Sequence, residues 1–136
     1  MVFCFVCCIM LNMPNSKSIL LVEDEPLLSS LLTQRLEKEG FSVVRAKDGE
    51  DALSKIREGS YSIVLLDIIL PKMSGFEFME KIGEDPQIED VPIVIISNLG
   101  QESDIEKGKE LGAVGYFVKA KISIEDLVEE IKKYLS

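Results

Sequence analysis

The chain has 136 residues, of which 46% are hydrophobic, enough for one domain with a buried core. Its 24 acidic and 15 basic residues give a formal net charge of −9, which argues against nucleic acid as a direct ligand because phosphate backbones require a basic surface. The absence of histidine excludes His-based acid–base catalysis, the Ser-His-Asp triad and His-ligated zinc.

The N-terminal segment is apolar and contains all of the cysteines, Cys4, Cys7 and Cys8. A metal site or a lipid anchor is one interpretation, but a closed zinc site needs further Cys or His ligands. Its 11-residue apolar run would be about 16 Å long as a helix, too short for a bilayer, and it lacks the positive residues of a signal peptide. We therefore expect a disordered or loosely packed tail over residues 1–16, a domain over residues 17–136 and no membrane span.

Short apolar runs alternate with longer amphipathic ones from residue 18 onward. This pattern predicts strands at 18–22, 41–46, 62–67, 91–97 and 115–119. It predicts helices at 26–39, at 48–59, from about 74, at 102–111 and from 124 to the end. Three of the strands are continuously apolar, which is typical of a parallel sheet covered by helices on both faces. The expected fold is therefore α/β, with five βα units.

Individual residues define the expected helices. The first helix carries an apolar face and ends before Gly40; that face consists of Leu27, Leu28, Leu31, Leu32 and Leu36. Phe76, Met79 and Ile82 mark the third helix. Ser123 with Asp126 three residues later resembles a capping box at the start of the last helix.

Polar residues follow the predicted strands at their carboxyl ends. Glu23 and Asp24 follow the first strand, Asp67 the third, Ser97 the fourth and Lys119 the fifth. In an open parallel sheet these ends share one edge, where ligands bind. An isolated ionised carboxylate at the end of a buried strand would be costly, so it must reach water, a cation or a partner.

The charges at this edge indicate a cation site. Three carboxylates and one lysine leave a charge of −2, and carboxylates that close would resist ionisation unless a cation joined them. Mg²⁺ prefers a few carboxylates together with water and phosphate oxygens. A carboxylate can then attack phosphorus and form an aspartyl phosphate, whose oxygens the metal, the lysine and the hydroxyl would share.

Four motifs together resemble the receiver domain of two-component response regulators, the CheY-like family. They are "ILLVEDE", "IVLLDIILPKMSG", "PIVIIS" and "LGAVGYFVKA", and the resemblance covers residues 17–136. It implies a single-domain receiver with a doubly wound, five-stranded parallel sheet in the flavodoxin-like order 2-1-3-4-5 and five helices. The implied role is a phosphorylation-controlled switch in the cytoplasm, not a classical enzyme.

The resemblance implies a role for each residue at the strand ends. Asp67 would be the phosphoacceptor. Mg²⁺ or Mn²⁺ would be bound by Asp24, Asp67 and the backbone carbonyl of Ile69, with Glu23 acting through a metal-bound water. Ser97 would bind the phosphoryl group.

Lys119 would pair with the phosphoryl group, and Tyr116 matches the aromatic switch residue that turns inward with Ser97. Two alternatives stay open, because Lys121 competes with Lys119 and an aromatic residue at the position of Tyr116 is often a packing residue.

Two features depart from the family pattern. Ala120 stands where the family usually has a proline, commonly after a cis bond; a cis bond before Ala costs about 3–4 kcal/mol, so we expect a trans bond and a displaced Lys119. Ile69 and Leu99 flank the path of an attacking water in this family, and both are apolar here. We therefore expect slow autodephosphorylation.

The expected phosphodonor is a sensor histidine kinase or a histidine phosphotransfer domain. The output would be a downstream protein that binds the face formed by the fourth helix, the fifth strand and the fifth helix, and phosphorylation would also promote a homodimer. No output domain is expected after the last helix. Two alternatives are a small Mg²⁺-dependent phosphohydrolase that uses Asp67 and a pseudo-receiver that binds partners without phosphate.

Overall fold

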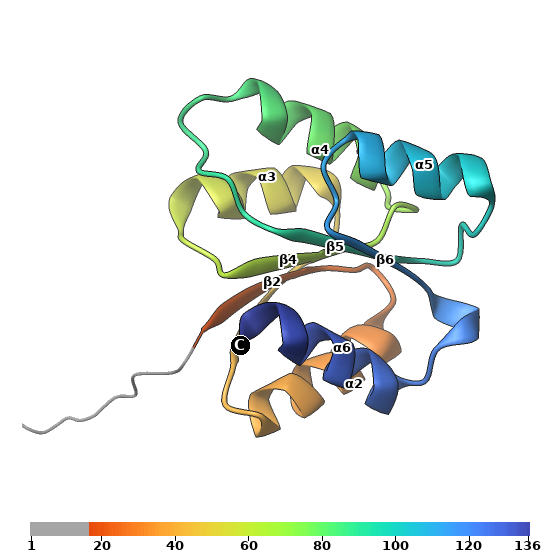
Figure 1. Ribbon diagram of the computed structural model, residues 1–136. Coiled ribbons are helices and arrows are strands. Elements are labelled where there is room, and N and C mark those ends of the chain that lie inside the picture. The colour runs from red at the N-terminus through yellow and green to blue at the C-terminus, as the bar shows by residue number, and fades with distance from the viewer. Residues whose placement is uncertain (1–16) are drawn as a thin grey trace, which may run out of the picture.

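The computed structural model describes residues 17–136, which form a three-layer α/β sandwich (Figure 1). The five strands are β2 (Ser18–Val22), β3 (Ser42–Ala46), β4 (Ile63–Leu66), β5 (Ile93–Ser97) and β6 (Gly115–Val118). All of their pairings are parallel, and the sheet order is β3-β2-β4-β5-β6. In chain order this is 2-1-3-4-5, so the predicted fold class is confirmed.

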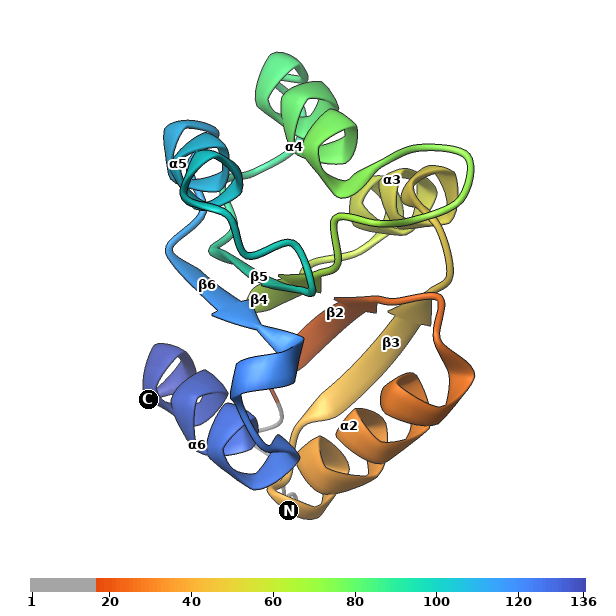
Figure 2. The same cartoon turned by 90° about the vertical axis from the view of Figure 1, so that its right-hand side faces the viewer.

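Helices cover both faces of the sheet, as Figure 2 shows in a view along it. One layer contains α3 (Gly49–Glu58), α4 (Gly75–Glu84) and α5 (Glu102–Glu110), and the other contains α2 (Pro26–Lys38) and α6 (Ile124–Leu135). A short 3-10 helix, η1 (Lys119–Lys121), follows β6. None of the helices in the described part of the chain has the length and apolar character needed to span a bilayer.

Each central strand contributes to two hydrophobic cores because its side chains alternate between the faces of the sheet. In β2, Leu20 and Val22 pack beneath α3 and α4, whereas Ile19 and Leu21 pack against α2 and α6. Phe78 of α4, fully buried, is among the largest side chains of the first core. Continuous burial on both faces explains why these strands are apolar at every position.

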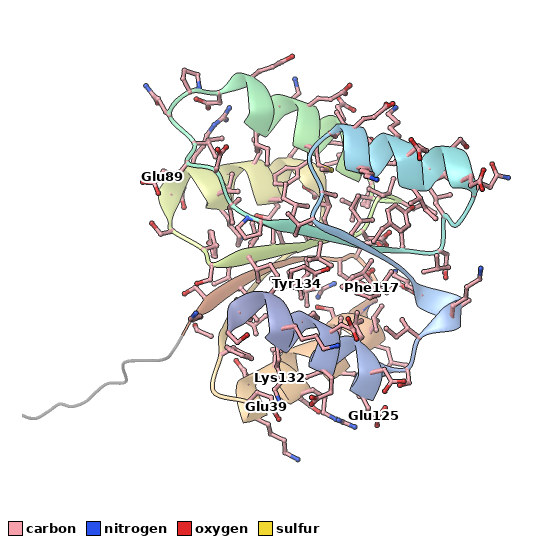
Figure 3. All side chains as sticks on the ribbon, viewed as in Figure 1. Glu39, Glu89, Phe117, Glu125, Lys132 and Tyr134 are labelled. Carbon is pink, nitrogen blue, oxygen red and sulfur yellow. The ribbon has the colours of Figure 1, made fainter. Side chains whose placement is uncertain are left out.

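Ion pairs join the two helices of the second layer. Lys132 of α6 contacts Glu39 at the end of α2 at 2.8 Å, and Figure 3 shows the two side chains side by side. Arg35 of α2 contacts Glu125 of α6 at 2.5 Å. Both pairs are solvent-accessible, so they add little to stability.

Some sequence-based details were wrong. Leu27 and Leu31 do not belong to the buried face of α2, because their side chains are 74% and 38% exposed. Lys119 lies in η1, one residue beyond β6.

Other predicted features are confirmed. Gly40 has a φ of +97° directly after Glu39, the C-cap residue of α2. Of the capping box expected at Ser123, the hydrogen bond from the Asp126 N–H to the Ser123 hydroxyl is present at 3.1 Å. The predicted tail, residues 1–16, lies outside the described residues, so the proposed boundary at residue 17 stays a prediction.

Gly75 allows the start of α4 to lie against the end of β4. Its N–H donates to the Ile68 carbonyl at 2.9 Å. A Cβ at this position would lie 2.4 Å from the Asp67 carbonyl oxygen and 2.8 Å from the Ile68 Cα. Because both neighbours are backbone atoms, the contact can be relieved only by moving the loop that carries Asp67.

We predict that Gly75→Ala and Gly83→Ala change stability in opposite directions. Overpacking at Gly75 should lower the free energy of unfolding by roughly 1–3 kcal/mol. Gly83 lies in the same helix, and a Cβ added there would meet no atom within 4 Å, so alanine should raise the free energy of unfolding by about 0.5 kcal/mol through helix propensity. Urea unfolding of both variants measures this difference, and a stabilised Gly75→Ala protein would contradict the packing account.

Candidate functional site

Asp67 lies immediately beyond β4, at the carboxyl edge of the sheet, with only 5% of its surface exposed. Its N–H continues the sheet by donating to the Val22 carbonyl of β2 at 3.0 Å. One carboxylate oxygen, Oδ1, accepts a hydrogen bond from the Ile69 N–H at 3.2 Å. The other, Oδ2, lies 2.9 Å from the Nζ of Lys119. The backbone and one ammonium therefore hold this buried carboxylate.

The ammonium of Lys119 contacts three carboxylates from two different strand ends. Its Nζ lies 2.8 Å from Glu23, 2.6 Å from Glu25 and 2.9 Å from Asp67. Its side chain is only 12% exposed. Burial opposes its charged form, but the hydrogen bonds to the three carboxylates outweigh this and raise the pKa of Lys119. Lys119 is therefore a permanent cation at neutral pH.

Glu23 is the most deeply buried acid of this group, with 2% of its surface exposed. One carboxylate oxygen faces Lys119 and the other accepts a hydrogen bond from the Glu25 N–H at 3.0 Å. Desolvation raises the pKa of Glu23, and the nearby charge of Asp67 adds to this, while the hydrogen bond from Lys119 acts in the opposite direction.

Glu25 is a member of this group that the sequence analysis missed. Glu23, Glu25 and Asp67 each offer an oxygen within 4.8 Å of the others, so they could hold a metal ion. Together with Lys119 they carry a net charge of −2, which a divalent cation would balance. The chain is extended at Glu25, with φ −76° and ψ 114°. Alternate residues of an extended chain share a side, a signal that could have identified Glu25.

Asp24 is exposed and is not a member of this acid group. Its predicted contact with a metal ion stays a prediction, as does the use of the Ile69 carbonyl. The side chain of Ile69 is 56% exposed beside the site.

The predicted trans bond before Ala120 is confirmed, and Lys119 still reaches Asp67. No peptide bond in residues 17–136 is cis, so the bond before Ala120 is trans. The turn of η1 nevertheless brings the Lys119 ammonium within hydrogen-bonding distance of Asp67.

Ser97 and Tyr116 form a second group, joined through Leu99. Ser97, at the end of β5, is fully buried, and its hydroxyl accepts a hydrogen bond from the Leu99 N–H at 3.3 Å. The Tyr116 hydroxyl of β6 donates to the Leu99 carbonyl at 2.5 Å. Burial raises the pKa of Tyr116, so its hydroxyl stays protonated and able to donate at neutral pH.

Comparison with known proteins identifies relatives over most of the described domain. Residues 19–132 match the model of the response regulator receiver domain. Protein PilH of Pseudomonas aeruginosa is 33% identical over 118 residues, which cover 87% of this chain and 97% of PilH. The non-phosphorylated receiver domain of HemR from Leptospira biflexa has a TM-score of 0.81 at 28% identity, covering 89% of this chain and 95% of that one.

Other curated relatives are much longer than this chain. The gliding motility regulatory protein of Myxococcus xanthus is 31% identical over 115 residues, which are 85% of this chain but only 15% of that protein. The chain likewise spans less than half the length of other relatives it matches.

We predict that the stability of Lys119→Met depends on pH more strongly than that of the wild type. Without the ammonium, the pKa of Glu23 should rise further above its unfolded value. A carboxyl group whose pKa is higher in the folded than in the unfolded protein stabilises the fold at pH values below its pKa in the unfolded protein. This stabilisation is lost as the pH rises through the pKa that the group has in the folded protein. In a chelator-containing buffer the variant should therefore lose about 3 kcal/mol at pH 8 and clearly less at pH 5.

Urea unfolding at the two pH values measures this effect, and Lys121→Met is the matched control. Lys121 is exposed two residues away and should show little change at either pH. An equal loss at pH 5 and pH 8 for Lys119→Met would contradict the assigned electrostatics.

Proposed function

Since this chain belongs to the response regulator receiver domain family, we propose that Asp67 is the residue through which it acts as a phosphoacceptor. The observation that carries this proposal is the contact between Asp67 and Lys119. It presents a buried carboxylate at a strand end, 2.9 Å from a permanent cation. Both Glu23 and Lys119, which the family pattern assigns to the same site, lie in direct contact there.

The proposed reaction is transfer of a phosphoryl group from the phosphohistidine of a sensor kinase or a histidine phosphotransfer domain. A carboxylate oxygen of Asp67 forms a bond to phosphorus while the bond from phosphorus to the imidazole nitrogen breaks. The nitrogen keeps the electron pair of that bond. Lys119 offsets the charge of the transferred oxygens, and the Ser97 hydroxyl hydrogen-bonds one of them.

The excess negative charge at this edge of the sheet fits a divalent cation, which we propose to be Mg²⁺ or Mn²⁺. Asp24, Asp67, the Ile69 carbonyl and, through water, Glu23 would hold it. The ion would supply charge neutralisation for the phosphoryl oxygens. A residual charge of −2 in the present group supports a divalent ion over a monovalent one.

The link from Ser97 through Leu99 to Tyr116 supports a route from the site to a partner surface. Tyr116 also packs against α5, since a Cβ at the buried Gly108 would lie 3.2 Å from its ring. Movement of the Ser97 hydroxyl toward a phosphoryl group would break its bond to Leu99 and disturb this packing. We infer that the face formed by α5, β6 and α6, which Figure 2 shows along one side of the sheet, changes with phosphorylation.

This face would bind a downstream protein or a second copy of the chain, and we expect this to occur in the cytoplasm. The family is in general a non-enzymatic switch, so the phosphohydrolase alternative is not favoured. The intact group of acids and lysine supports phosphate-dependent action over a pseudo-receiver. Turnover of phosphate esters would reverse the first of these conclusions.

We predict that acetyl phosphate adds one phosphoryl group to the wild-type protein in the presence of Mg²⁺. Transfer to Asp67 would release acetate with the bonding electron pair. Intact-protein mass spectrometry measures the adduct, which should be absent without Mg²⁺ and absent in Asp67→Asn. A folded wild-type protein that gains no mass, or an adduct that survives in Asp67→Asn, would contradict the proposed function.

The same samples test the expected slow autodephosphorylation. After removal of the donor, the adduct should persist, because Ile69 and Leu99 offer no side-chain hydrogen bond to an attacking water. In Ile69→Asn, a polar side chain can hydrogen-bond this water. One such hydrogen bond contributes about 1 kcal/mol, so hydrolysis should be about fivefold faster. Faster decay in the wild type than in Ile69→Asn would contradict this account.

A further inference from the structure

The ammonium of Lys119 already contacts three carboxylates before any phosphoryl group arrives. An ammonium has three N–H donors, and its three carboxylate partners lie between 2.6 and 2.9 Å away. Phosphorylation converts the Asp67 carboxylate into an acyl phosphate, which carries up to about two negative charges in place of one and offers three acceptor oxygens. The phosphoryl oxygens therefore compete with the remaining carboxylates, Glu23 and Glu25, for the ammonium of Lys119.

Glu25 is the partner that is released at least cost. Its side chain is 56% exposed, against 2% for Glu23 and 5% for Asp67. On release, the Glu25 carboxylate regains water, so an exposed pair of this kind is weak. Glu23 would be left charged and buried without its cation, which is far more costly.

The place of Glu25 in the chain supports a specific role for its side chain. It occupies the N-cap position of α2, yet it makes no side-chain capping hydrogen bond. Glutamate is not among the residues that serve well at this position. Its carboxylate instead reaches Lys119 at the end of β6, 94 residues further along the chain.

We propose that Glu25 is the exchangeable partner of Lys119, holding the ammonium over the unmodified Asp67 and giving way to the incoming phosphoryl group. Glu25 is thus a positioning residue that stabilises the unphosphorylated form and slows phosphoryl uptake. This inference rests on the proposed function of Asp67. It concerns the contact between Glu25 and Lys119 and does not require Glu25 to bind the metal.

Two substitutions separate the contact from the charge. Glu25→Asp keeps the charge but shortens the side chain. Aspartate at an N-cap position accepts hydrogen bonds from the helix N–H groups, which turns it away from Lys119. Glu25→Gln keeps the length and removes the charge. Glu84→Gln, at the exposed end of α4, changes the net charge equally but lies away from the site; it is the matched control.

The experiment measures the initial rate of mass addition from acetyl phosphate at saturating Mg²⁺, together with Mg²⁺ affinity by calorimetry. Loss of one exposed ion pair that stabilises the unphosphorylated form corresponds to about a two- to fivefold change in the rate of phosphorylation. Both Glu25 variants should therefore be phosphorylated about two- to fivefold faster than the wild type. Glu84→Gln should match the wild type, and Glu25→Asp should bind Mg²⁺ within about twofold of it.

Several results would overturn the inference while leaving the proposed function intact. Unchanged or slower uptake in both Glu25 variants would show that Glu25 does not compete for Lys119. Acceleration in Glu25→Gln alone would assign the effect to local charge. A tenfold or greater loss of Mg²⁺ affinity in Glu25→Asp would make Glu25 a metal ligand. No mass addition to the folded wild type would instead overturn the proposed function, and this inference with it.

Discussion

The contact between Lys119 and three carboxylates is the interaction on which the rest of the site depends. It joins the ends of β2, β4 and β6, which lie apart in the sequence and meet at one edge of the sheet. Two of these carboxylates are buried, a placement that would be strongly unfavourable without a cation. The same arrangement leaves an excess negative charge that a divalent ion can balance. The same group of charges therefore stabilises this edge of the sheet and forms the proposed cation site.

The fold places this contact through the regular geometry of its sheet. Parallel strands bring their carboxyl ends to the same edge, and helices on both faces bury the strands up to that edge. Gly75 holds the loop that carries Asp67 in place by allowing the backbone of α4 close to it. At the neighbouring strand end, the chain of contacts from Ser97 through Leu99 to Tyr116 leads away from the site toward the surface formed by α5, β6 and α6. The site and the proposed partner surface are thus connected by few, identifiable contacts.

The sequence predicted the order of elements well because continuous apolar strands and amphipathic helices have distinct periodicities. It also located Asp67, Glu23 and Lys119, since each directly follows a strand. It was less informative about side-chain direction. Leu27 and Leu31 appeared to extend the apolar face of α2 but are exposed, because the spacing of leucines along a helix does not show how far the sheet beneath it reaches. Alternation along the extended chain could have placed Glu25 on the same side as Glu23, but its contact with Lys119, 94 residues away, depends on the tertiary fold.

The central claim is that Lys119, and not its neighbour Lys121, provides the cation for phosphoryl transfer to Asp67. The most direct measurement is the rate of Mg²⁺-dependent phosphoryl uptake from acetyl phosphate in Lys119→Met and Lys121→Met, with folding of both checked by circular dichroism. We expect the rate of uptake to fall at least a hundredfold in Lys119→Met, as when one group that stabilises charge in a transition state is removed, and to be unchanged in Lys121→Met. Comparable rates in the two variants would contradict this claim.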